Sequence, residues 1–441
     1  MNQERYVAAI EISSSKIIAV VGKVQNNGQL EIIATEQERW VEGVRYGIIQ
    51  NPEETATRIR RILDRLQRKP AVQPREITGL YVGLSGRSLR SLPTEVGLNL
   101  PPDTEINDDI LGRLRALALK AAIDSSLEVV DAIPRIYTVG KSQTHSPKGA
   151  IGDRINAIYD LIVCRPELRR NIERTLTDKV GIHIEGYIVT ALSTAQVILS
   201  SEQKRLGCMF VDMGAETTEV SIYKGGHLQY FATLPLGGRN ITRDITSERL
   251  LEEKAEELKI TIGNALPRDI STSMNVDGVR TSEVLNLVVA RSEEIVANIV
   301  EQISYAGLKE ADLPAGVICI GGGSKLNGIL ELIANQTGMK VERGGLPSYI
   351  RIEDGKAHQM EMMEVASVLY SGGMNSEGEC LAKPKAELPK TGEGNPEERE
   401  EEERKLREKP QKNKSSFFKS WGEKISSIFG APDDDNSDLI E

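Results

Sequence analysis

The sequence predicts an α/β protein that contains an internal duplication and carries a smaller α+β unit within its first half. A strand, a short polar turn and a second strand occupy residues 6–24, and the same pattern returns at 209–223, about 200 residues later. Strand-like segments alternate with helical segments in both halves, which is typical of α/β folds. In addition, an apolar strand at 317–320 runs directly into a triplet of glycines.

The first copy opens with three strand segments rich in β-branched residues, at 6–12, 16–24 and 30–35. Three serines form the turn between the first two. Residues 52–68 predict a helix, because their apolar side chains recur at helical spacing. A polar turn between two apolar strands places hydroxyl and backbone N–H groups at a hairpin tip, where they can meet a ligand.

The next block, roughly 88–165, predicts the inserted α+β unit. After a strand at 80–84 come turns, a helix at 108–123 and a strand at 155–164. The first half then ends with a helix at 166–180, a strand at 184–189 and the start of another helix at 193–201.

The second copy begins with a strand at 209–212 that ends in Asp212. Two further strands, at 218–223 and 228–234, flank a glycine-containing turn, as in a β-hairpin. The remaining expected elements are helices at 240–259, 281–305, 326–337 and 361–370, with the strand at 317–320 before the third of them. Asp212 thus occupies the place in the second copy that Glu11 occupies in the first.

Composition excludes several classes of protein. The formal net charge of −10 argues against nucleic-acid binding, which requires a basic face. The four cysteines show no metal-ligand spacing, and Cys208 and Cys319 lie in apolar strands, so reduced thiols in the cytosol are expected. The N-terminus lacks the apolar core of a signal peptide, and no run of 18 apolar residues predicts a membrane span.

The C-terminal region changes character after residue 380. Residues 381–414 are rich in Pro, Glu, Lys and Gly and predict a disordered linker. Residues 415–430 then predict an amphipathic helix with lysines off its apolar stripe, which suits a bilayer interface. The stripe consists of Phe417, Phe418, Trp421, Ile425, Ile428 and Phe429. A groove on a partner protein and packing against the body are the alternative destinations of this helix.

Three segments carry the chemistry of a phosphate-bearing ligand. Residues 11–16 and 212–218 each supply a carboxylate, backbone N–H groups and hydroxyls, and the first also supplies Lys16. Two carboxylates close to a triphosphate suit Mg²⁺ held through water. The glycine triplet at 321–323 lets the backbone approach an adenosine or phosphate group closely. The order of the three segments is more informative than any one of them.

These motifs resemble those of the actin, hexokinase and Hsp70 superfamily. Residues 9–17 (AIEISSSKI) and 211–220 (VDMGAETTEV) resemble its two phosphate motifs, and 320–324 (IGGGS) resembles its adenosine motif. Within the superfamily, the FtsA family of bacterial cell division proteins is similar at 234–238 (LPLGG) and at the helix 252–259 (EEKAEELK). The match covers about residues 5–375 and 415–430.

The resemblance implies a two-lobed, actin-like (ribonuclease H-like) ATPase fold with four subdomains. Subdomain 1A would comprise 1–87, 166–202 and about 360–380, and the inserted subdomain 1C would comprise 88–165. Subdomain 2A would comprise 203–244 and 311–359, and subdomain 2B would comprise 245–310. The linker and the membrane-targeting helix would complete the chain.

The resemblance also implies ATP and Mg²⁺ in the cleft between the lobes. Glu11 and Asp212 would hold the metal ion and its waters. The residues in contact with phosphates would be Ser14, Ser15, Lys16, Gly214, Thr217 and Thr218. The residues near the cleft and the nucleoside would be Gly237, Gly238, Glu256, Lys259, Gly321, Gly322 and Gly323.

This sequence departs from the family pattern at three positions. Glu11 stands where relatives usually have Asp, Ser13 where they have Gly, and Glu216 where a second Gly is common. The Cβ of Ser13 crowds a phosphate and the carboxylate of Glu216 repels one, and no residue stands out as a catalytic base. We therefore expect ATP binding with weak or no hydrolysis.

In function, the resemblance implies a protein that tethers FtsZ filaments to the cytoplasmic face of the inner membrane at the division site. Subdomain 2B would bind the C-terminal peptide of FtsZ, and the chain would polymerise head to tail and recruit later division proteins. Two alternatives remain at this point. One is a small-molecule kinase of the same superfamily, and the other is a pilus-assembly actin homologue.

Overall fold

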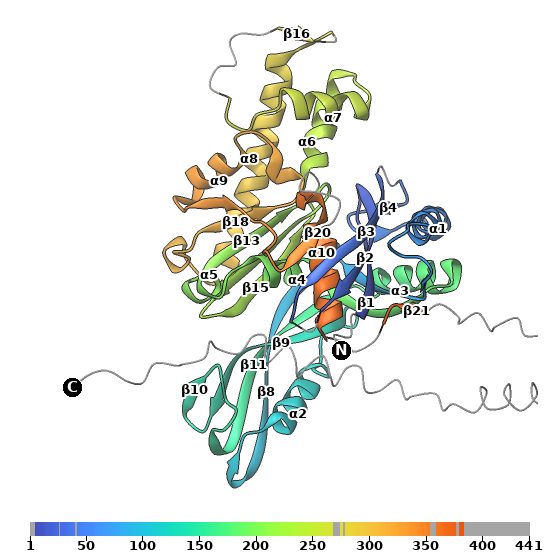
Figure 1. Ribbon diagram of the computed structural model, residues 1–441. Helices are drawn as coiled ribbons and strands as arrows, with labels where there is room; N and C mark the ends of the chain where they lie inside the picture. Colours follow the sequence, from blue (N-terminus) through green and yellow to red (C-terminus); the bar gives the residue numbers. More distant parts are fainter. Residues whose placement is uncertain are drawn as a thin grey trace, which may run out of the picture.

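The computed structural model describes residues 5–25, 27–39, 42–267, 274–276, 278–352, 359–375 and 379–382. Two lobes lie side by side, and a smaller unit projects from them at the bottom of the view in Figure 1. Within the described residues, no helix has the length and apolar character needed to cross a membrane. The predicted linker beyond residue 382 and the predicted helix at 415–430 lie outside the described residues.

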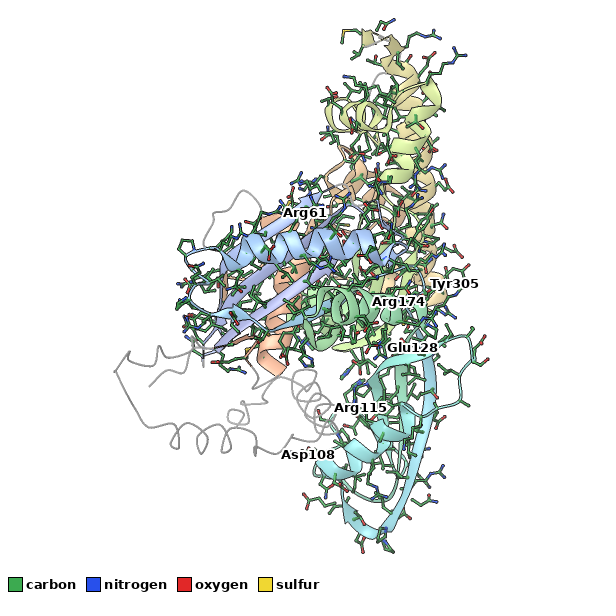
Figure 2. All side chains as sticks on the ribbon, turned by 90° about the vertical axis from the view of Figure 1, so that its right-hand side faces the viewer. Arg61, Asp108, Arg115, Glu128, Arg174 and Tyr305 are labelled. Atoms are coloured by element: carbon green, nitrogen blue, oxygen red, sulfur yellow. The ribbon has the colours of Figure 1, made fainter. Side chains whose placement is uncertain are left out.

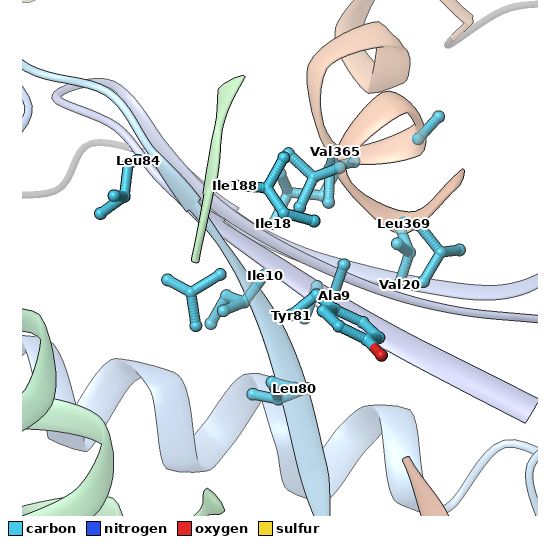
Figure 3. Packing of buried hydrophobic residues seen from close by; sticks show 14 of the residues in the cluster. Ala9, Ile10, Ile18, Val20, Leu80, Tyr81, Leu84, Ile188, Val365 and Leu369 are labelled. Atoms are coloured by element: carbon cyan, nitrogen blue, oxygen red, sulfur yellow. The ribbon is translucent and has the colours of Figure 1, made fainter. Parts of the chain in front are cut away.

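The first lobe is built on a sheet with the strand order β12-β7-β1-β2-β3-β20. Its strands are β1 (Arg5–Ile12), β2 (Lys16–Val24), β3 (Leu30–Arg39), β7 (Gly79–Leu84), β12 (His183–Val189) and β20 (Ile350–Ile352). The sheet is apolar on both faces, because helices cover both of them (Figure 3). α10 (Gln359–Asn375) packs against β1, β2 and β7, and α1 (Pro52–Gln67) packs against β2 and β3.

Helix α1 shows how local sequence determines an element of this lobe. Asn51 caps its start by accepting a hydrogen bond from the N–H of Glu54, and Pro52 supplies a suitable first residue. Ile59, Ile62 and Leu66 form its buried face. The predicted helix at 52–68 is confirmed to within one residue.

The remaining short elements of the first lobe connect this framework. They are β4 (Val44–Arg45), β5 (Ile48–Ile49), β6 (Glu76–Ile77), α3 (Glu167–Glu173), a π-helical segment (Arg174–Val180), α4 (Thr190–Ile198) and β21 (Leu381–Ala382). The helix that follows α4, α5 (Ser201–Leu206), belongs to the second lobe, where it packs against β14 (Thr218–Lys224). β4 and β5 form a small hairpin, and β21 pairs with β6. Leu381 is buried in that pair, so residues 381–382, which the sequence assigned to the linker, form a strand of the first lobe.

The second lobe repeats the core of the first. β13 (Cys208–Met213) pairs antiparallel with β14 (Thr218–Lys224) and parallel with β18 (Val317–Ile320), as β1 pairs with β2 and β7. The other elements are β15 (His227–Leu234), α6 (Gly238–Ile245), α7 (Glu252–Thr261), β16 (Asn275–Val276), β17 (Val279–Arg280), α8 (Thr281–Tyr305), α9 (Ile329–Thr337) and β19 (Val341–Arg343). The duplication seen in the sequence is therefore a duplication of strand pairing.

The projecting unit has its own hydrophobic core and lies at the bottom of Figure 2, where Asp108, Arg115 and Glu128 are labelled. Its elements are β8 (Arg90–Glu105), α2 (Asp108–Ala118), β9 (Glu128–Val139), β10 (Ser142–Thr144) and β11 (Ile151–Cys164). β8 also pairs with β15 at Arg90 and Ala232. This bridge joins the unit to the edge of the second lobe's sheet.

Several sequence predictions need correction here. A turn at 87–88 follows β7 as expected, but the next residues form the long strand β8, whose side chains alternate between exposed and half-buried positions and include three prolines. β9 was missed as well. The single helix predicted at 240–259 is divided into α6 and α7 by a 3-10 turn and by Arg249, which has a positive φ of 64°. The predicted burial of Cys208 and Cys319 is confirmed, and all four thiols are free.

Candidate functional site

The two polar turns have the same backbone plan. In the first, the N–H of Ser13 donates to the carbonyl of Lys16 over 2.9 Å, and in the second the N–H of Gly214 donates to the carbonyl of Thr217 over 2.8 Å. Glu11 and Asp212 each lie two residues before the start of the turn. Since both turns close a strand pair at its end, they present backbone N–H groups in equivalent positions.

The folded chain brings the two turns together across the lobes. The guanidinium of Arg239, at the start of α6, donates to the carbonyl of Ser14 over 3.1 Å. The tip of the β4–β5 hairpin contacts both turns. The N–H of Tyr46 donates to Glu216 Oε2 over 2.7 Å, and the N–H of Gly47 donates to Ser14 Oγ over 3.0 Å.

The glycine triplet lies against the second turn. Gly321 has a φ of 83°, and a Cβ there would lie 2.5 Å from both Asp212 Oδ1 and the carbonyl oxygen of Met213. A Cβ at Gly323 would lie 3.0 Å from the same Met213 carbonyl oxygen, whereas Gly322 faces open space. At position 321 only glycine fits this close approach of backbones, so this part of the sequence signal reflects a packing requirement.

Gly237 and Gly238 complete the contact from the side of α6. The N–H of Gly238 donates to the carbonyl of Gly214 over 3.0 Å, and a Cβ at Gly237 would lie 2.6 Å from the carbonyl oxygen of Ala215. A Cβ at Gly238 would come within 3.9 Å of the Cα of Gly323. Thus the first turn, the second turn, the triplet and the Gly237–Gly238 pair meet around one location.

Buried carboxylates gather behind the turns. Glu11, Asp212 and Glu219 are 4%, 6% and 5% exposed, and Glu364 on α10 faces them. Burial, and then the charge of Glu364, raises the pKa of Glu11 and of Asp212 above the ordinary range. The same two causes raise the pKa of Glu219 to about 8. Glu11 Oε2 and Glu219 Oε1 have no hydrogen-bond partner among the described residues.

Lys16 supplies the cation of this cluster. Its ammonium lies 3.2 Å from Glu364 Oε2 and also donates to the carbonyl of Glu361, both on α10. Burial alone would lower the pKa of Lys16, but the charges of Glu364 and Glu11 raise it above its ordinary value. One ammonium does not balance the facing carboxylates once they ionise. A divalent cation fits this imbalance.

Glu256 and Lys259, both on α7, lie beside Gly238. The ammonium of Lys259 donates to the carbonyl of Gly238 over 3.0 Å and to Glu256 Oε2 over 2.7 Å. Burial lowers the pKa of Lys259 despite the nearby charge of Glu256. The hydroxyl of Thr242 bridges the pair.

Some predicted contact residues already hold protein partners. Ser14 Oγ accepts from Gly47, and Thr218 Oγ1 donates to the carbonyl of Leu236 over 2.8 Å. Ser15, Thr217 and Gly214 are half-buried. Sequence reasoning did not identify Glu219 or Glu364 as parts of the site. Glu219 is the cross-strand partner of Asp212, a register that the hairpin pattern could have supplied.

Comparisons with known proteins are consistent with this arrangement. Residues 209–369 match a family model described as "FtsA: Cell division protein FtsA". The Cell division protein FtsA of Porphyromonas gingivalis is 33% identical over 330 residues, which cover 73% of this chain and 68% of that protein. The Cell division protein FtsA of Pseudomonas aeruginosa is 27% identical over 392 residues, covering 86% and 92%.

A solved structure described as a PilM-PilN type IV pilus biogenesis complex has a similar fold. It superimposes with a TM-score of 0.57 at 16% identity, over 83% of this chain and 96% of that chain. The predicted mixed α/β, actin-like fold is confirmed.

Proposed function

Because this chain belongs to the FtsA family of cell division proteins, we propose that it binds Mg–ATP between its lobes and anchors FtsZ filaments to the cytoplasmic membrane. One observation carries the nucleotide part of this proposal. The two polar turns and the glycine triplet lie far apart in the sequence, yet they meet at one place. Family membership sets aside the small-molecule kinase and the pilus-assembly homologue as alternatives.

The residues suggest how the nucleotide lies. Backbone N–H groups of residues 14–16 and 215–217 suit its phosphates, as anion-binding turns do, while those of Ser13 and Gly214 close the turns. Gly321, Gly322 and Gly323, with Gly237 and Gly238, allow the backbone to approach the nucleoside. The Glu256–Lys259 pair lies at that end and offers polar contacts for ribose or adenine.

Glu11 and Asp212 would hold Mg²⁺. Among the described residues, no group of three or more His, Cys, Asp or Glu side chains is arranged to ligate a metal ion directly. The carboxylates therefore suit an ion whose remaining ligands are water and phosphate oxygens, as is common for Mg²⁺. When bound, the ion supplies positive charge that neutralises phosphate oxygens. Glu216 and Ser13 stand against the phosphates, and we expect weak or no hydrolysis.

Attachment to the membrane would reside in the predicted helix at 415–430, outside the described residues. Each large apolar side chain of its stripe contributes at most about 1.5–3 kcal/mol on burial, so one helix is a weak anchor. A head-to-tail polymer would present many such helices together and strengthen binding. Residues 245–310 would bind the C-terminal peptide of FtsZ, placing the chain at the division site with other division proteins.

The nucleotide part is tested by calorimetry with ATP and Mg²⁺. Asp212→Ala is expected to weaken binding at least about tenfold, because it removes a buried carboxylate at the metal position. Asp312→Ala is the matched control, since Asp312 lies on the same lobe but pairs with Lys224 at the surface. Equal affinities for the two variants would remove Asp212 from the site.

The membrane part is tested by flotation of the full chain with liposomes that contain anionic lipid. Trp421→Glu places a charge on the apolar stripe and is expected to abolish co-flotation. Ser427→Glu adds the same charge on the opposite side of the predicted helix and is expected to retain most of it. Unchanged flotation of Trp421→Glu would refute the tail as the anchor.

A further inference from the structure

Glu216 is a buried carboxylate, 1% exposed, in the second turn. It accepts the N–H of Tyr46 over 2.7 Å and forms ion pairs with Arg45 Nε at 2.9 Å and Arg243 Nη2 at 2.5 Å. Arg239 Nη1 lies 3.5 Å from the same oxygen atom that Arg45 and Arg243 contact. A single carboxylate is thus enclosed by guanidinium groups and a backbone N–H.

The positive charge around Glu216 exceeds what its own charge balances. Burial acts to raise the pKa of Glu216, but the N–H of Tyr46 and the guanidinium groups of Arg243, Arg45 and Arg239 lower it below its ordinary value. Arg239 has a second carboxylate partner, Glu252, at 3.3 Å. Guanidinium groups gathered with backbone N–H groups form the usual protein environment of a phosphate oxyanion.

The groups that enclose Glu216 come from both lobes. Arg243 and Arg239 lie on α6 of the second lobe, whereas Arg45 and Tyr46 lie on the β4–β5 hairpin of the first. Tyr46 has a φ of 50°, which is unfavourable for a residue with a side chain. Such a conformation persists only where surrounding contacts hold it, and the bond to Glu216 is one of them.

The location of this carboxylate follows from the proposed nucleotide orientation, on which the inference rests. The nucleoside end lies near Gly323, Gly238 and Lys259, and the phosphates extend toward the first turn. Arg239 contacts both Ser14 of that turn and Glu216. The phosphate farthest from the base would therefore arrive where the carboxylate of Glu216 is seated.

We propose that the Glu216 carboxylate occupies the position of a triphosphate's terminal phosphate, and so makes the site discriminate in favour of nucleoside diphosphates. A triphosphate must displace Glu216 from Arg45, Arg243 and Tyr46 before its terminal phosphate can reach them. A diphosphate leaves these contacts in place. Glu216 is a specificity-determining residue, and it acts through charge and through occupancy of the same donors.

The experiment compares dissociation constants of ATP and ADP, both with Mg²⁺, for the full chain by calorimetry. In Glu216→Ala, the ratio of the ATP constant to the ADP constant is expected to fall about tenfold, with ADP affinity changed by less than about twofold. Glu216→Gln keeps the size of the side chain and removes its charge, so a smaller fall is expected. Glu216→Gln also provides the test if the alanine variant does not fold.

Matched variants separate this effect from general electrostatics. Glu252→Ala removes the other carboxylate near Arg239 and is expected to leave the ratio unchanged. Adding Arg45→Ala to Glu216→Ala is expected to restore most of the original ratio, because the terminal phosphate binds the guanidinium that Glu216→Ala frees. An unchanged ratio in both Glu216 variants, or an equal fall in Glu252→Ala, would overturn the inference.

The same measurements distinguish failure of this inference from failure of the proposed nucleotide site. Binding of either nucleotide to the unaltered chain supports the nucleotide site whatever the ratio does. If Glu216→Ala binds ATP where the unaltered chain binds neither nucleotide, Glu216 blocks the whole site, and both the preference for diphosphates and nucleotide binding by the unaltered chain are rejected. If no variant binds a nucleotide, both proposals are rejected.

Discussion

The two polar turns share one backbone plan and differ in where their side chains are directed. In the first turn, Ser14 binds the β4–β5 hairpin and Lys16 reaches α10 within the same lobe. In the second turn, Glu216 crosses to the other lobe and meets arginines there and on α6. Repeated strand pairing therefore fixes the backbone N–H groups, while substitutions in each copy decide what else the turn does.

The strands behind the turns differ as well. Glu219 on β14 stands opposite Asp212, whereas Ile18 on β2 stands opposite Glu11. The second copy thus contributes two carboxylates and the first contributes one, with Lys16 beside it. The asymmetry lies in the strand pairs alone, because the second carboxylate of the first lobe, Glu364, comes from α10. The predictions below test this difference between the copies, from the largest expected effect to the smallest.

The largest difference is expected in the stability cost of replacing glycine by alanine beside Asp212, at Gly321, and beside Glu11, at Gly83. Gly321→Ala forces a Cβ to within 2.5 Å of backbone and carboxylate oxygens at a φ of 83°, and should cost about 3 kcal/mol of unfolding free energy. Gly83→Ala places its Cβ 2.7 Å from Thr190 Oγ1, a hydroxyl that can rotate, and should cost about 1 kcal/mol. Chemical denaturation of both variants checks this. Equal costs would show that the two strand ends are packed alike.

A second effect is expected in the pH dependence of stabilisation by Mg–ADP. Glu219, with a pKa of about 8 against an ordinary 4.5, binds a proton in the folded state that the unfolded chain releases. Without metal, its contribution to stability therefore declines as pH rises from about 4.5 to 8. Mg²⁺ favours the ionised carboxylate. Mg–ADP should therefore raise the thermal unfolding midpoint by about 2–4 °C more at pH 8.5 than at pH 6.

Scanning calorimetry at the two pH values provides the measurement. Glu219→Gln removes one of the titrating groups, so the difference between the two gains should shrink. Ile18→Val changes the corresponding position of the first copy without altering charge and should keep the difference. If the gain is the same at both pH values in the unaltered chain, the buried carboxylates do not face the metal ion.

Much of this site was accessible from the sequence because its parts are local. Each turn lies between two adjacent strands, and a glycine triplet after a strand is visible as a short motif, so their residues and even the bounds of β2 were predicted. Contacts between distant segments were not accessible. Glu364 meets Lys16 across 348 positions of sequence, and it lies on a largely apolar helix whose two glutamates form no recognisable pattern.

The arginine enclosure of Glu216 was missed for a related reason. Arg45 and Tyr46 lie in a hairpin of two-residue strands, too short for a period of two to be recognised, and Arg239 and Arg243 follow a glycine pair on α6. The sequence showed a carboxylate in place of a small residue but not the groups that neutralise it. β8 escaped prediction because its exposed, proline-containing pattern resembles loop sequence.

The smallest expected effect concerns the tip of the β4–β5 hairpin. There the N–H of Gly47 binds the first turn and the N–H of Tyr46 binds the second. Ser14→Ala removes the acceptor for the buried N–H of Gly47 and should cost about 1–2 kcal/mol locally, because that donor is left unpaired. Amide exchange at Gly47 should accelerate by about tenfold or more, while Tyr46, bound to Glu216, changes less. Ser15→Ala, at the next and half-buried position, is the control and should leave both amides unchanged. If Tyr46 and Gly47 accelerate together in Ser14→Ala, the hairpin opens as one unit and the turns do not hold it independently.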